Sequence, residues 1–138
     1  MNDDMNCLMN LCRHNEKDKI QDILDNKSNE DLLELFEQII DNNPFLFEPA
    51  IWIIISKIYS EDDRFVRLLC KLIENTSSDF AFGKIIEPIE EIALWQQEKT
   101  LAIANKMINI GIKRGTCSGI IISPLLGRDI IDKEMILS

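Results

Sequence analysis

Apolar residues recur at helical spacing along nearly the whole chain, and this pattern constrains the fold more than any other feature. Strict alternation of apolar and polar residues, which marks half-buried strands, is almost absent. Hydrophobic residues make up 46% of the 138 residues, which is enough to fill one core in a chain of this length. The sequence therefore predicts an all-α fold, with a single helical domain over 1–138.

Residues that favour helix ends divide this pattern into separate helices. Asn29, followed by Glu30 and Asp31, favours a helix start, because capping side chains and acidic charges stabilise the free N–H groups there. Pro49 suits the first turn of another helix, and Gly115 suits the end of the longest one. The predicted helices span 3–13, 16–25, 30–42, 48–59, 61–75, 79–94, 96–114, 117–123 and 129–137.

Two of these segments carry additional signals. The run 50–55 is apolar all round, which predicts a helix buried on both sides with Trp52 in the core; a buried strand is the alternative. Pro88 lies inside 79–94 and is expected to kink or divide that helix, because proline has no backbone N–H to donate.

The predicted helices also repeat in pairs. First helices start near 30, 61 and 96 and second helices near 48, 79 and 117, so successive pairs are separated by about 31–38 residues. Short connections favour antiparallel neighbours, and each pair exposes apolar residues that the next pair would cover. In length and pattern the pairs resemble HEAT and armadillo repeats. The expected architecture is a short α-solenoid of stacked helical hairpins, with an irregular helical bundle as the alternative.

The charge balance restricts the class of partner. The chain has 24 acidic and 15 basic residues, a net charge of −9. Such a surface repels phosphate backbones and anionic lipids, so no nucleic-acid and no membrane partner is expected, whereas a basic protein would be attracted. The start Met-Asn-Asp-Asp lacks the basic and apolar parts of a secretory signal, and no apolar run approaches the ~20 residues of a bilayer span. The expected location is the cytoplasm.

The four cysteines and the single histidine do not have the spacing of a metal site. Cys7, Cys12 and His14 lie close together but lack a fourth ligand, while Cys70 and Cys117 are isolated. Free cysteines buried in the core are therefore expected, with no metal and no cofactor. His14 follows the first predicted helix, where its ring would favour the negative helix end.

Several patterns resemble catalytic sites without completing one. No Gly-x-Ser-x-Gly elbow accompanies the histidine, and in 111–119 the basic residues precede the second glycine, unlike in a P-loop. Carboxylates at helical spacing are typical of a solvated face. Lys99, Lys106 and Lys113 recur every seven residues and are expected to pair with the acidic helix 79–94. The chain is therefore expected not to be an enzyme.

One helix face gathers acidic residues that a basic partner would meet. In stacked helical hairpins the second helices usually line a concave binding face. The expected partner-binding residues there are Glu48, Asp79, Glu87, Glu90 and Glu91, opposed only by Lys57 and Lys84. The competing face, on the first helices, carries Glu30, Asp31, Glu34, Glu37 and Asp41.

The whole chain resembles the small, acidic, all-helical immunity proteins of bacterial toxin–immunity systems, such as those of contact-dependent growth inhibition. The features that carry the resemblance are the size, the Met-Asn-Asp-Asp start, the −9 charge and the helical-hairpin pattern. The resemblance implies a cytoplasmic protein that covers the active site of a cognate nuclease toxin. The alternative is a helical-repeat scaffold or adaptor, or the terminal fragment of a longer repeat protein.

Overall fold

Helices form the regular structure of the described part of the chain. The computed structural model describes residues 3–76, 82–111 and 121. This part contains no β-strand, which confirms the all-α prediction and shows the strand alternative for 50–55 to be wrong; none of its helices is long and apolar enough to cross a membrane. The elements are α1 (Asp3–Arg13), α2 (Lys17–Asp25), α3 (Asn29–Asp41), the 3-10 helix η1 (Pro44–Phe47), α4 (Glu48–Ile58), α5 (Asp63–Thr76), α6 (Phe82–Trp95) and α7 (Gln97–Asn109).

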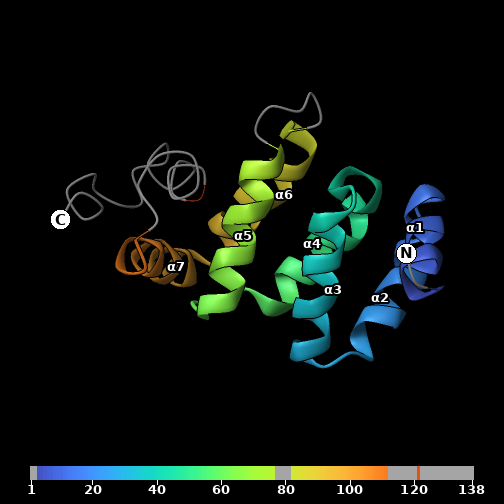
Figure 1. Ribbon diagram of the computed structural model, residues 1–138, viewed down its shortest axis with the longest axis horizontal. Helices are drawn as coiled ribbons and strands as arrows, with labels where there is room; N and C mark the ends of the chain where they lie inside the picture. The colour runs from blue at the N-terminus through green and yellow to red at the C-terminus, as the bar shows by residue number, and fades with distance from the viewer. Residues whose placement is uncertain (1–2, 77–81, 112–120, 122–138) are drawn as a thin grey trace.

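The helices pack in two rows. In one row α2 contacts α4 and α4 contacts α6; in the other, α3 contacts α5 and α5 contacts α7. Contacts of α3 with α4, α5 with α6 and α6 with α7 join the rows, and α1 packs on α2, η1 and α4. α1 and α7 lie at opposite ends of the long axis, with α3 and α5 side by side between them (Figure 1). Each helix therefore packs against helices that are close to it in the sequence.

A continuous apolar core joins the rows. Phe36 of α3 and Phe65 of α5 stack with ring centroids 6.3 Å apart, and Tyr59 meets Phe65 edge-on at 5.9 Å. Ile54, at the centre of α4, is fully buried. The Tyr59 hydroxyl and Thr100 Oγ1 of α7 lie 2.6 Å apart in a buried hydrogen bond. Burial raises the pKa of Tyr59 to about 12, because the phenolate would lose its hydration.

Two helix starts differ from the sequence prediction by one or two residues. Ser28 Oγ accepts a hydrogen bond from the Asp31 N–H at 3.2 Å, so Ser28 rather than Asn29 caps α3. Asp62 Oδ1 accepts hydrogen bonds from two N–H groups in the first turn of α5, at 3.0 and 3.3 Å, and α5 accordingly begins at Asp63. Both caps satisfy N–H groups that have no partner inside their helix.

The end of α7 comes earlier than the sequence predicts. The helix ends at Asn109, and Gly111 follows with a φ of +91°, a left-handed conformation that glycine adopts without strain. The prediction that Gly115 ends this helix is therefore wrong. The predicted helices 117–123 and 129–137 lie outside the described residues, apart from Ile121, which is buried.

Proline occurs within α6 without dividing it. The helix runs from Phe82 to Trp95 as one element and contains Pro88. Because Pro88 has no N–H, the backbone carbonyl of Lys84, one turn earlier, lacks its usual helical donor. The prediction that Pro88 divides the helix is wrong, and the predicted kink stays a prediction.

Candidate protein-binding groove

Three successive helices of one row surround a groove of about 690 Å³. This volume falls within the range of sites that bind ligands. α4 lies between α2 and α6 in the row, so the groove extends over all three helices. We name it the Trp52 groove. It is lined by Asn15, Lys17, Asp18, Gln21, Glu48, Pro49, Trp52, Ile53, Lys84, Glu87, Pro88 and Glu91.

Helical periodicity explains which side chains line the groove. On α6, Lys84, Glu87, Pro88 and Glu91 recur at intervals of three and four residues, which places them on one helix face. Glu90 falls between these positions; it is exposed on α6 but does not line the groove. The α6 wall of the groove therefore presents two carboxylates one helical turn apart.

Trp52 is exposed to 41%, so the prediction that it lies in the core is wrong. α4 packs against α1, α2, α3 and α6, which bury its isoleucines, such as Ile51 and Ile54. One stripe of the helix stays open, and a weak signal for it exists in the sequence. Glu48, Trp52 and Ser56 recur every four residues, and this is the stripe on which the apolar helix carries polar side chains. An exposed tryptophan between polar residues is typical of a contact surface.

The charged side chains of the groove are mainly acidic. Four are carboxylates (Asp18, Glu48, Glu87 and Glu91) and two are ammonium groups (Lys17 and Lys84), which gives 2 − 4 = −2. Within the described residues, no basic group lies within ion-pair distance of any of these carboxylates. The Lys84 ammonium lies 5.6 Å from the centroid of the Phe45 ring instead. Among the described residues, the carboxylates of the groove therefore have no basic partner.

The structure brings three of the five predicted partner-binding residues together in this groove: Glu48, Glu87 and Glu91. Glu90 lies outside the lining, and Asp79 lies outside the described residues. Lys57, which is predicted to oppose them, forms an ion pair with Asp25. Sequence analysis did not identify the contribution of α2, and it assigns Trp52 to the core. The assignment of the five predicted residues to the binding of a partner stays a prediction.

The competing acidic face, on α3, contacts basic side chains of the next helix in its row. The Arg64 guanidinium donates to Glu30 Oε1 at 2.9 Å, and the Lys71 ammonium donates to Asp41 Oδ1 at 2.6 Å. The hydrogen bond with Asp41 raises the pKa of Lys71. These pairs join α3 to α5 near both ends of α3, while Glu34 between them has no ion pair to a described residue.

The basic strip on α7 also pairs within this row. Lys106 lies 3.7 Å from Asp63 of α5, so the prediction that it pairs with the acidic residues of α6 is wrong. Arg67 donates to the same carboxylate at 2.7 Å, and this hydrogen bond lowers the pKa of Asp63. Lys99 is exposed, and Lys113 lies outside the described residues. α7 packs against both α5 and α6, and the ion pair places Lys106 toward α5.

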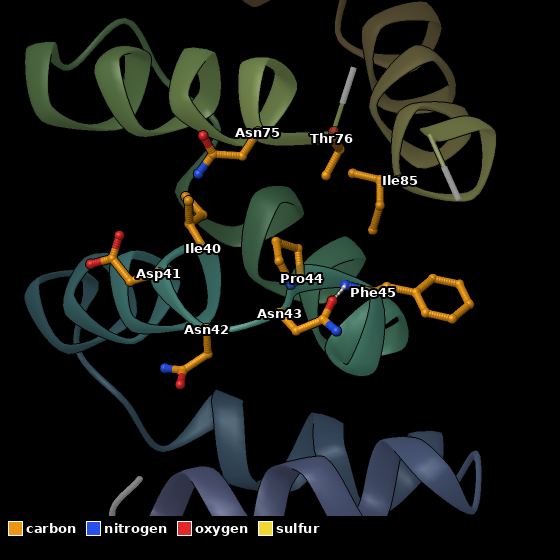
Figure 2. A pocket seen from close by; sticks show the side chains of 9 residues that line it. All are labelled: Ile40, Asp41, Asn42, Asn43, Pro44, Phe45, Asn75, Thr76 and Ile85. Atoms are coloured by element: carbon orange, nitrogen blue, oxygen red, sulfur yellow. Dashed lines mark hydrogen bonds between the residues drawn. The ribbon is translucent and has the colours of Figure 1, made fainter. Parts of the chain in front are cut away.

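A second pocket, of about 410 Å³, lies where the end of α3 and η1 meet α5 and α6 (Figure 2). Its polar groups serve the local backbone. Asn43 Oδ1 accepts from the Phe45 N–H at 3.2 Å, Asn42 donates to the Gln38 carbonyl at 2.8 Å, and Thr76 donates to the Leu72 carbonyl at 2.8 Å. The Asn42 and Asn43 contacts cap the end of α3 and start η1, an element that sequence analysis missed, while the Thr76 contact lies within the last turn of α5. The pocket is therefore explained by the connection between helices. It is lined by Ile40, Asp41, Asn42, Asn43, Pro44, Phe45, Asn75, Thr76 and Ile85.

The cysteines and the histidine near the N-terminus occupy different environments. Cys12 is buried, which raises the pKa of its thiol, whereas Cys7 is exposed, contrary to the prediction that the cysteines lie in the core. The His14 ring lies 2.9 Å from the Asn10 carbonyl, which confirms its predicted place at the end of α1. Cys70 is buried, and Cys117 lies outside the described residues. In 3–76, 82–111 and 121, no three histidine, cysteine or acidic side chains converge as metal ligands would.

Comparison of the chain with protein-family models, with curated proteins and with solved structures gave no match. The functional proposal therefore depends on the residues and contacts of the chain itself. Of the two pockets described, the Trp52 groove combines an exposed aromatic side chain with carboxylates that have no ion pair to a described residue, and it is the candidate site.

Proposed function

We propose that the protein acts by binding a basic segment of another protein in the Trp52 groove, and not by catalysis. One observation carries the proposal: an exposed tryptophan lies in a groove whose carboxylates have no ion pair with any described residue. Tryptophan is enriched among the residues that dominate binding energy, and unpaired acidic groups attract and orient a basic partner.

A solenoid architecture would explain the position of the groove. The succession of contacts from α2 to α4 to α6, and from α3 to α5 to α7, is what a stack of HEAT-like or armadillo-like hairpins produces. In such a stack, helices of one row line a shared binding face, and the Trp52 groove lies on one row. We propose this architecture in preference to an irregular bundle.

For the partner, we propose a basic toxin domain of the nuclease type, with this protein as its cytoplasmic immunity protein. The net charge of −9 supports this proposal, because a nuclease surface that binds phosphates also attracts acidic proteins. The second candidate is a helical-repeat scaffold or adaptor, for which the same groove would hold a basic segment. Protection of cells that express the partner separates the two, since a scaffold would give no protection.

The test compares two charge reversals of equal size. Glu87→Lys with Glu91→Lys alters the groove, and Glu34→Lys with Glu61→Lys alters two exposed carboxylates outside it. When the tagged wild-type protein is expressed in cells and purified, it is expected to retain a basic partner protein. The variant with Glu87→Lys and Glu91→Lys is expected to lose this partner, and the control variant is expected to retain it. Partner amounts are measured by quantitative mass spectrometry, with circular dichroism to confirm folding. Equal retention by both variants would show that the groove does not bind the partner.

A further inference from the structure

We infer that the group recognised in the Trp52 groove is an arginine side chain of the partner, which stacks on the Trp52 indole and pairs with Glu87 and Glu91. This inference rests on the proposed function and deepens it, because it names which basic side chain the groove selects. Lysine is the competing ligand. Three features of the groove favour the guanidinium over the ammonium.

The first feature is the exposed indole. A cation over the face of tryptophan is attracted by the ring quadrupole, and a planar guanidinium also stacks on it, which an ammonium does not. Trp52 is 41% exposed and lies on α4, the middle helix of the three that line the groove. A cation–aromatic contact already occurs at the edge of this region, where Lys84 lies over Phe45.

The second feature is the pair of acceptors on α6. Glu87 and Glu91 are four residues apart on the face that lines the groove, so their carboxylates are neighbours. A guanidinium has five N–H donors in a fixed fork and can donate to two carboxylates at once. Neither carboxylate has an ion pair with a described residue. The site therefore offers more acceptors than a single ammonium can use in one orientation.

The third feature is a backbone carbonyl. Pro88 leaves the Lys84 carbonyl without its usual helical donor, and both residues belong to the α6 face that lines the groove. A further N–H of the guanidinium can satisfy this oxygen.

Entry into a groove also removes water from the ligand, and the guanidinium is more weakly hydrated than the ammonium.

The experiment uses Trp52 as its own reporter. The chain has two tryptophans, and Trp95 is 81% exposed, so Trp95→Phe leaves Trp52 as the single tryptophan with little effect on packing. Acetylated and amidated hexa-arginine and hexa-lysine peptides are titrated into this protein. We expect saturable quenching by hexa-arginine, with an affinity at least about tenfold above that of hexa-lysine.

Matched neutral variants locate the binding. The double variant Glu87→Gln with Glu91→Gln is expected to lower the affinity for hexa-arginine at least about tenfold. The control Glu34→Gln with Glu61→Gln is expected to change this affinity less than about twofold. Trp52→Leu, measured by calorimetry, is expected to abolish the preference for arginine while weaker binding of both peptides persists. Circular dichroism verifies the fold of each variant.

Several results would overturn the inference. Equal affinities for the two peptides, both dependent on Glu87 and Glu91, would leave the proposed basic partner in place and exclude arginine selection. Absence of peptide binding, or binding that the Glu87 and Glu91 variant leaves unchanged, would exclude the site itself. A dimer that buries Trp52, detected by sedimentation without peptide, would show that the occupant is a second copy of this chain.

Discussion

The acidic residues on the α3–α5–α7 row and those in the Trp52 groove have different surroundings. On the α3–α5–α7 row, three carboxylates pair with basic side chains of a neighbouring helix in the same row: Glu30, Asp41 and Asp63. In the groove, Glu87 and Glu91 have no ion pair to a described residue. The comparison teaches that similar clusters of acidic residues in a sequence can have different uses. One cluster joins helices, whereas the other has no ion pair to a described residue.

The core that joins the rows should dominate stability, and its disruption should affect both regions together. Phe65 is fully buried against Phe36 and Tyr59. Phe65→Ala is expected to lower the free energy of unfolding by about 3–5 kcal/mol, since it removes buried surface and leaves a cavity. Urea denaturation measures this loss. Trp95→Ala, at a side chain that is 81% exposed, is the control. A similar loss for both variants would contradict the assignment of the core.

A smaller effect is expected where α7 meets the connection between α4 and α5. Tyr59→Phe removes the hydrogen bond to Thr100 and should cost about 0.5–1.5 kcal/mol. Burial raises the pKa of Tyr59 from 10.0 to about 12, so its neutral form stabilises the fold fully below pH 10, and this contribution is lost as the pH rises through 12. The free-energy difference between wild type and variant should therefore shrink across this pH range, as urea titrations at several pH values would measure. A constant difference would contradict the burial of this hydroxyl.

The smallest effect should separate the two acidic clusters. Glu30→Gln removes an ion pair with Arg64, whereas Glu87→Gln removes a charge that has no ion pair to a described residue, from a protein of net charge −9. Loss of the pair should lower the urea midpoint slightly at low salt and less at high salt, because surface pairs are weak and screened. Loss of the Glu87 charge should leave the midpoint equal or slightly higher, because like-charge repulsion decreases. A lower midpoint for Glu87→Gln would reveal an internal partner and argue against the groove as a docking site.

The sequence predicted the helices well because each leaves a local pattern. α1 has the predicted bounds, and the acidic residues on α6 fall into lining and non-lining positions according to helical phase. Local patterns do not predict the side-chain exposure and the ion-pair partners that depend on neighbouring helices. α4 is apolar all round, so its periodicity does not tell which stripe stays open, and Trp52 was assigned to the core. α7 packs on both α5 and α6, and Lys106 pairs with Asp63 of α5, a choice that no spacing within α7 reveals.

The contacts of each helix with near neighbours in the chain also have a kinetic consequence. α4, for example, contacts α2, α3 and α6, which lie one or two helices away in the chain, and α1, which lies three helices away. Closing the loops between such helices costs little conformational entropy. Helical proteins with mainly local contacts therefore fold quickly, in about 10⁻⁶ to 10⁻³ s. We therefore expect the helices that line the Trp52 groove to pack early in folding, with the groove complete when α6 joins α4.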